Sequence, residues 1–149
     1  MAKIKEGDQM PPFRLKNQDD QWFDSTSLQG HPFVLYFYPK DDTPGCTAQA
    51  CSFRDAIEEF KDIDVQVVGV STDSPASHKA FATRHQLPFT LLSDEGNQLR
   101  KQLGVPGSLF GLLPGRVTYV VDASGIVQRI FSSQLKVKQH VKEALKVLH

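Results

Sequence analysis

The sequence predicts a three-layer α/β fold with a mixed central sheet, because strand-like and helix-like segments alternate through its middle. Three short apolar runs are each followed by a segment with helical spacing, a pattern typical of parallel strands joined by crossover helices. A predicted hairpin precedes this region, and a second hairpin and a last helix follow it. At 149 residues, the chain is expected to form one domain, residues 1–149.

The first elements are expected at the edge of the domain. After a loose lead-in, residues 1–12, two short strands at 13–16 and 22–23 flank the polar turn 17–21. This arrangement predicts an N-terminal β-hairpin. Residues 27–30 are expected to form a short helical turn.

The central strand is predicted at residues 33–38, where consecutive apolar and aromatic residues indicate burial on both faces of a sheet. It runs into residues 39–45, which are rich in the proline, aspartate and glycine of turns. Beyond this turn, apolar residues recur at helical spacing, so a helix is predicted to begin at Cys46 and to continue to about Asp62.

A second strand is predicted at residues 65–71, which are nearly all apolar. The helix after it should have Ser74 as its N-cap and Pro75 as its first residue, and should run to about His85. A helix between two buried strands implies a right-handed parallel crossover.

A third strand is predicted at residues 89–92, and Ser93 and Asp94 are expected to cap a helix that Gly104 ends. The segment 104–115 contains too many glycines and prolines for regular structure. It is nevertheless apolar, with side chains that need a surface to pack against: Leu109, Phe110, Leu112 and Leu113. Two interpretations stay open: a loop packed on the core, or a surface for substrate or partner.

The last elements are a second hairpin and a helix. Strands at 117–121 and 126–131 flank the turn 122–125 and are antiparallel. The closing helix carries an apolar stripe. Its members are Val137, Val141, Ala144, Leu145 and Leu148.

The overall charge excludes one class of partner. Lysine plus arginine and aspartate plus glutamate number 17 each, so no net field attracts nucleic acid or an anionic membrane. Residues 1–8 lack the apolar core of a signal peptide, and no apolar run reaches the length of a membrane span. We therefore expect no nucleic-acid partner and no stable membrane insertion, although a removed transit peptide would leave no trace.

The two cysteines, Cys46 and Cys51, are too few for the disulfide framework of a small secreted protein. Zinc and copper sites need more ligands than two thiols, and the histidines are scattered without paired spacing, so no metal or other cofactor is expected. A single cysteine is most often an inert buried residue. Cys46 instead follows a strand and a turn and lies at the start of a helix. This position favours a reactive thiol, because unpaired amides and the helix dipole stabilise a thiolate.

The sequence around Cys46 resembles that of the peroxiredoxins. Pro39, Thr43 and Cys46 match the active-site signature of that family. Cys51 is similar to the second cysteine of its peroxiredoxin Q branch, also called bacterioferritin comigratory protein. The resemblance continues through residues 69–73, 89–94 and 116–122, so it covers most of the chain. Residues 109–116 look most like chloroplast and cyanobacterial members.

The resemblance implies a thioredoxin-like fold and a thiol peroxidase without metal, haem or flavin. It makes Cys46 the peroxidatic and Cys51 the resolving cysteine, with Pro39, Thr43 and Arg116 completing the peroxide pocket. Peroxide cleavage needs a thiolate and donors for the departing oxygen, which a threonine hydroxyl, the Cys46 amide and an arginine can supply. Pro39 has no N–H to compete for the sulfur and can help to exclude water.

The implied partners are a hydroperoxide and thioredoxin or a related dithiol protein. Because both cysteines lie in one chain, a monomer is expected to suffice. The compartment is expected to be cytoplasmic, or the chloroplast if this is a mature plant chain. Two alternatives stay open: a thiol-disulfide oxidoreductase on the same fold, and a copper or haem-iron chaperone that uses a cysteine pair and a distal histidine.

Overall fold

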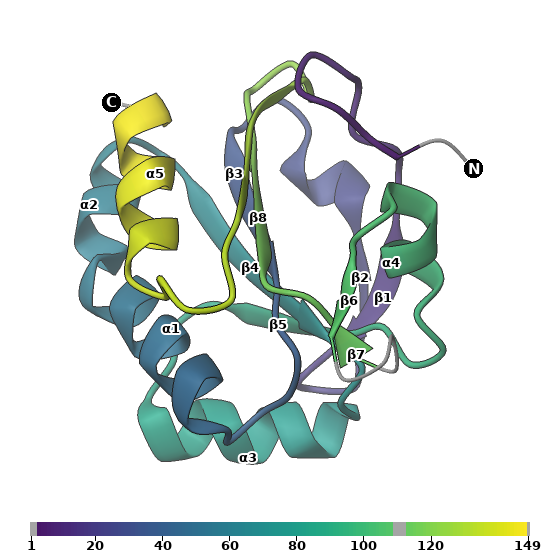
Figure 1. Cartoon of the computed structure of the whole chain (residues 1–149), viewed down its shortest axis with the longest axis vertical. Coiled ribbons are helices and arrows are strands. Elements are labelled where there is room, and N and C mark those ends of the chain that lie inside the picture. The colour runs from purple at the N-terminus through teal and green to yellow at the C-terminus, as the bar shows by residue number, and fades with distance from the viewer. Residues whose placement is uncertain (1–2, 109–112, 149) are drawn as a thin grey trace.

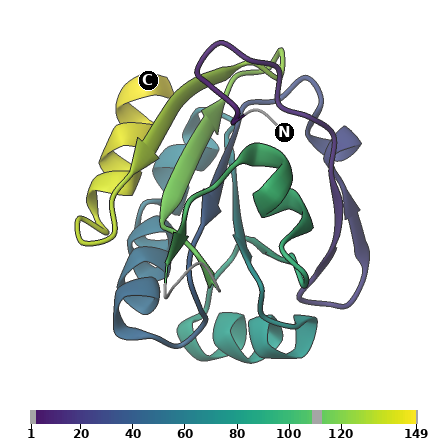
Figure 2. The same cartoon turned by 45° about the vertical axis from the view of Figure 1, so that its right-hand side comes forward.

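A mixed sheet with helices on both faces forms the molecule, as Figures 1 and 2 show for a computed structural model that describes residues 3–108 and 113–148. Over these residues the main sheet has seven strands in the order β2-β1-β5-β4-β3-β8-β9. β3 and β4 are parallel, as are β4 and β5, and the other neighbours are antiparallel. Their bounds are β1 Arg14–Asn17, β2 Trp22–Asp24, β3 Phe33–Phe37, β4 Gln66–Ser71, β5 Thr90–Ser93, β8 Val117–Val121 and β9 Val127–Ser132. The predicted mixed sheet, edge hairpin and parallel crossovers are confirmed.

The central strand β3 divides the core into two halves. Its residues alternate between the faces, as a strand requires, and every one of them is buried. Val34 and Tyr36 belong to one apolar cluster, whereas Leu35 and Phe37 belong to the other. Burial on both faces explains why this strand reads as an unbroken apolar run.

The two faces are covered differently. Helices α1 (Pro44–Asp55), α2 (Ile57–Asp62), α3 (Pro75–His85) and α5 (Gln139–Leu148) pack their apolar residues into the cluster of Val34 and Tyr36. The opposite cluster is closed by α4 (Gln98–Leu103), by the 3-10 turn at Ser25–Leu28 and by N-terminal residues that include Ile4 and Met10. Figure 1 shows this division, with α1, α2 and α5 on one side of the sheet and α4 on the other.

The helix after β3 begins earlier and ends sooner than the sequence predicted. Pro44 is its first residue, since a proline at this position lacks only an N–H that would have no helical partner. α1 ends at Asp55, the N–H of the C-cap residue Ala56 donates to the Ser52 and Phe53 carbonyls, and α2 follows as a separate helix. Cys46 therefore lies within the first turn of a helix.

The cap of α4 also differs in detail. The helix starts at Gln98 rather than directly after Asp94, but the Asp94 carboxylate still accepts hydrogen bonds from the amides of Leu99 and Arg100, at 3.0 and 2.9 Å. Asp94 therefore caps the helix across a turn.

The segment after Gly104 is less irregular than predicted. β6 (Gly107–Ser108) pairs with β7 (Leu113–Pro114) in a separate two-stranded ladder. Leu109, Phe110 and Leu112 lie outside the described residues. Whether the apolar side chains of this segment pack on the core stays a prediction.

Gly69 in β4 gives a test of this packing. A Cβ atom at Gly69 would lie 2.9 Å from both Leu91 Cδ2 and Tyr36 Cζ, and 3.0 Å from the Tyr36 hydroxyl. Gly69→Ala should lower the free energy of unfolding by about 1–3 kcal/mol, measured by urea denaturation. The double variant with Tyr36→Phe, which removes the hydroxyl oxygen, should recover part of the loss. An unchanged urea midpoint in Gly69→Ala would contradict this packing.

Candidate active site

Cys46 lies where the chain leaves β3 and enters α1. It is the third residue of the helix and 2 % exposed. The amides of Gly45 and Cys46 precede the first intrahelical hydrogen bond, which Thr47 donates to the Thr43 carbonyl at 2.8 Å. Cys46 therefore lies at the positive end of a twelve-residue helix, beside amides that have no helical partner.

Arg116 reaches the same sulfur from the opposite part of the sequence. Its Nη1 atom lies 3.4 Å from Cys46 Sγ, and the residue is 6 % exposed. Arg116 immediately precedes β8, the antiparallel neighbour of β3. The start of β8 therefore lies beside the end of β3, from which the chain leads to Cys46. The guanidinium also lies against Gly45, where an added Cβ would be 3.0 Å from Nη2. The sequence-predicted pair of Cys46 and Arg116 is therefore in contact.

The backbone around Arg116 is fixed on both sides. Its Nε donates to the Gln134 carbonyl at 3.2 Å, and its own carbonyl accepts from the Ser133 amide at 3.2 Å. Before it, the Gly115 amide donates to the Pro106 carbonyl at 2.6 Å. A Cβ at Gly115 would lie 2.7 Å from that same oxygen, so only glycine allows this approach. The arginine thus presents its guanidinium from a constrained base.

Gln49 is a site residue that sequence reasoning missed. It lies one helical turn after Cys46, is fully buried, and accepts a hydrogen bond from Arg116 Nη1 at 2.7 Å. Its Nε2 has no hydrogen-bond partner among the described residues. The spacing of three residues from Cys46 was the available signal, since it places both side chains on one face of a helix. Gln49 thus binds the guanidinium that contacts the sulfur, and its amide nitrogen is a donor without a partner among the described residues.

His140 on α5 supports this corner of the sheet. Its Nε2 donates to the Ser133 carbonyl at 2.9 Å, and its Nδ1 accepts from the Thr118 hydroxyl at 2.7 Å. Burial, joined by the charge of Arg116, lowers the pKa of His140, whereas the Ser133 hydrogen bond opposes that shift. The imidazole is therefore neutral at neutral pH, and it ties α5 to the chain beside Arg116.

Thr43 and Pro39 lie in the loop that leads to Cys46. Thr43 is the N-cap residue of α1 by its backbone, but its hydroxyl donates to the Lys40 carbonyl at 2.9 Å rather than to a helix amide. Pro39 follows the central strand and is partly buried. Both residues thus belong to the loop that enters α1, and the Thr43 hydroxyl proton is used within that loop.

Cys51 lies on the same helix as Cys46. Both cysteines are free thiols, and Cys51 is partly exposed. Five residues of α-helix separate two Cα atoms by roughly 8–9 Å and turn their side chains to different directions. A disulfide needs Cα atoms within about 7 Å. The helix therefore keeps the two thiols apart in this structure.

Other features lie away from Cys46. In the described part of the chain, the only group of histidine, cysteine, aspartate or glutamate side chains that could surround a metal includes neither cysteine. A surface hollow bordered by Pro11, Leu28 and Ala123 lies at the other end of β3 and contains none of the predicted site residues. No helix within residues 3–108 or 113–148 is long and apolar enough to cross a membrane.

Known proteins share both the sequence and the fold of this chain. The AhpC/TSA family matches residues 6–130. The chloroplastic peroxiredoxin Q of Populus jackii is 54 % identical over 147 residues, which are 99 % of this chain and 69 % of that protein.

Two solved structures are also similar. The peroxidoxin BcpB of Mycobacterium tuberculosis is 36 % identical, with a TM-score of 0.90 over 97 % of this chain and 96 % of that one. A bacterioferritin comigratory protein of Xanthomonas campestris, studied for its alkyl peroxide reduction activity, is 29 % identical, with a TM-score of 0.82 over 91 % and 89 %. The similarity spans the thioredoxin-like fold and the region that brings Cys46 and Arg116 together. The chain therefore belongs to the AhpC/TSA family, as a thiol peroxidase of the peroxiredoxin Q branch.

Proposed function

We propose that Cys46 is the peroxidatic cysteine and Cys51 the resolving cysteine of a thioredoxin-dependent peroxidase. The observation that carries the proposal is the contact of Arg116 Nη1 with Cys46 Sγ, 3.4 Å, at the start of α1. A cation and free helix amides stabilise both the attacking thiolate and the negative charge that moves onto the departing oxygen.

In the first step, the Cys46 thiolate attacks the nearer peroxide oxygen and the O–O bond breaks. Cys46 becomes a sulfenic acid, and the departing oxygen takes a proton and leaves as water or an alcohol. The donors for that oxygen are Arg116, which contacts the sulfur, and the amide nitrogen of Gln49, which has no other partner among the described residues. Thr43 joins them when its hydroxyl rotates away from the Lys40 carbonyl, and Pro39 limits the access of water.

In the second step, the Cys51 sulfur attacks the Cys46 sulfenic acid, the S–S bond forms, and water leaves. A dithiol protein of the thioredoxin type then reduces the disulfide by thiol-disulfide exchange and is itself oxidised. Both cysteines belong to one chain, so the cycle is complete within a monomer.

The small exposed fraction of Cys46 favours a hydroperoxide, whose reacting group is only two atoms wide. The alkyl peroxide reduction activity studied in the Xanthomonas campestris relative supports organic hydroperoxides as substrates beside hydrogen peroxide. Of the two compartments expected from the sequence, the chloroplastic relatives support the chloroplast. The decisive assay couples peroxide loss to NADPH oxidation through thioredoxin reductase and thioredoxin. An unchanged rate when thioredoxin is omitted would exclude this reductant.

The two cysteine variants should differ. Cys46→Ser should abolish peroxide reduction, because a hydroxyl forms almost no anion at neutral pH. Cys51→Ser should consume about one equivalent of peroxide and accumulate a sulfenic acid that dimedone traps, since only resolution is lost. Mass spectrometry counts the dimedone adduct. Full multiple-turnover activity of Cys51→Ser with thioredoxin would remove Cys51 from the resolving role.

Arg116→Met keeps much of the side-chain length and removes the charge. The second-order rate with hydrogen peroxide should drop by roughly 10²-fold, because a donor to the developing negative charge is lost. Arg129→Met is the matched control, because Arg129 lies on the neighbouring strand and pairs with Glu6 and Glu143 instead. Competition kinetics with hydrogen peroxide measures this rate for both variants and for wild type. Equal values for Arg116→Met and wild type would make Arg116 a bystander.

The disulfide requires α1 to unwind, because the helix holds the two Cα atoms too far apart. Amide exchange should therefore speed up over residues 44–55 on oxidation, while residues 65–70 and 117–121 stay protected. The sample needs mass-spectrometric proof of the Cys46–Cys51 disulfide. Equal protection of residues 44–55 in reduced and oxidised protein would contradict the unwinding.

A further inference from the structure

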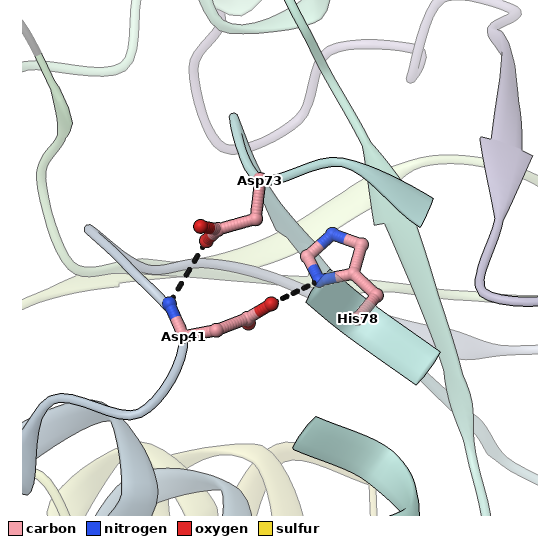
Figure 3. Close-up of side chains that lie close together, drawn as sticks. All are labelled: Asp41, Asp73 and His78. Atoms are coloured by element: carbon pink, nitrogen blue, oxygen red, sulfur yellow. Dashed lines mark hydrogen bonds and ion pairs between the residues drawn. The ribbon is translucent and has the colours of Figure 1, made fainter. Parts of the chain in front are cut away.

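A polar cluster, largely buried, joins the loop that leads to Cys46 to α3 and to the segment before it. Figure 3 shows its members: the Asp41 carboxylate points at the His78 ring, and the Asp73 carboxylate points at the Asp41 backbone nitrogen. His78 Nδ1 lies 2.7 Å from Asp41 Oδ2, with both side chains almost inaccessible to solvent. Asp73 Oδ2 accepts from the Asp41 amide at 2.8 Å. The loop is thus attached to α3 and to the end of β4 from the inside.

The Asp41 carboxylate receives hydrogen bonds on both of its oxygens. Tyr38 donates to Oδ1 at 2.6 Å, and Ser77 donates to Oδ2 at 2.9 Å, in addition to the His78 contact. Burial, followed by the negative charge of Asp41, holds the pKa of Tyr38 well above its ordinary value, so this hydroxyl remains a donor. Three ligand atoms of Asp41, Asp73 and His78 lie within 4.8 Å of one another. Because the carboxylates already accept these bonds, we interpret the cluster as a hydrogen-bond network rather than as a metal site.

The second ring nitrogen of His78 defines where the protons are. Nε2 lies 2.9 Å from the Leu92 carbonyl, which can only accept, so Nε2 carries a hydrogen. Nδ1 faces a carboxylate oxygen at hydrogen-bond distance, so one proton lies between His78 and Asp41. This differs from His140, whose Nδ1 accepts from a threonine hydroxyl.

The loop needs such an attachment because its next residue is strained. Asp42 has φ 61°, a left-handed conformation that residues other than glycine adopt at a cost in free energy and that persists only when the surroundings impose it. Thr43, which follows, supplies the N-cap backbone of α1, and Cys46 is three residues further on. A displacement of Asp41 would therefore also displace the Cys46 sulfur, because only a short stretch of chain separates the two residues.

We propose that His78 is a positioning residue for the peroxidase reaction, and that its Nδ1 contact with Asp41 fixes the Pro39–Thr43 loop so that Cys46 and Thr43 meet the peroxide correctly. The inference rests on the proposed role of Cys46. His78 itself contacts neither the sulfur nor, through the described residues, Arg116.

Two substitutions separate this role from simple core packing. The amide nitrogen of asparagine takes the place of Nδ1, so His78→Asn can keep the bond to Asp41. The amide nitrogen of glutamine takes the place of Nε2, so His78→Gln can keep only the bond to Leu92. His78→Gln should slow the second-order reaction of Cys46 with hydrogen peroxide by roughly tenfold or more, whereas His78→Asn should retain most of the rate.

His31→Gln is the control, since His31 precedes β3, at the end opposite to the loop, and pairs with Asp64 at the surface. It should react at the wild-type rate. Melting temperatures and circular dichroism are recorded for all variants. Ser77→Ala, which removes one donor to Asp41 from a less buried position, should cause a smaller loss in the same direction and tests the clamp if the His78 variants do not fold.

Equal rate losses in His78→Asn and His78→Gln, or wild-type rates in both, would overturn the positioning role. If purified wild type retains stoichiometric metal and His78→Gln lacks it, the interpretation of the cluster as a hydrogen-bond network is overturned. A wild-type chain that consumes no peroxide would instead contradict the proposed function, so the two failures are distinguishable. In proton NMR spectra, an imidazole N–H resonance far downfield that is present in wild type and absent from Asp41→Ala would support the hydrogen bond between His78 and Asp41.

Discussion

The contact between the Arg116 guanidinium and the Cys46 sulfur joins two parts of the chain that are 70 residues apart. It forms because β8 lies antiparallel to β3, so that the beginning of β8 lies beside the end of β3. Most of the local structure can be understood as support for this contact. Pro44 starts the helix early, Gly45 leaves space for the guanidinium, and Gln49 holds it from the next turn.

Two kinds of attachment surround the reactive turn. Before Cys46, the loop is bound through Asp41 to a buried network on α3, and through Asp42 to Arg84 at the surface, at 2.8 Å. After Cys46, α1 is held by apolar contacts, among them the Phe53 ring stacked on Tyr36 at 4.5 Å. Hydrogen bonds between buried groups fix geometry more sharply than apolar contacts, which tolerate sliding. The loop before Cys46 is therefore attached mainly by directional hydrogen bonds.

Sequence reasoning reached the sheet and the crossovers because these depend on local periodicity, whereas it reached the pair of Cys46 and Arg116 through the resemblance to the peroxiredoxins. The break at Ala56 was not predictable in the same way, since the apolar spacing of Phe53 and Phe60 continues across it. The displaced cap of Asp94 depends on a turn conformation that no pattern announces. Gln49 and His78 were missed because each acts through a partner far away in sequence. Tertiary structure alone decides whether such polar residues are buried.

The break at Ala56 has an energetic consequence for the proposed cycle. Because α2 is a separate helix, unwinding can stop at the end of α1 and leave Phe60 packed under the sheet. The free energy lost in unwinding α1 opposes disulfide formation, so it raises the reduction potential of the Cys46–Cys51 pair, by about 30 mV for each 1.4 kcal/mol. In the proposed cycle this increment favours reduction of the disulfide by a dithiol, and the length of α1 sets its size. The length of α1 thus links the mechanics of the fold to the redox poise of the enzyme.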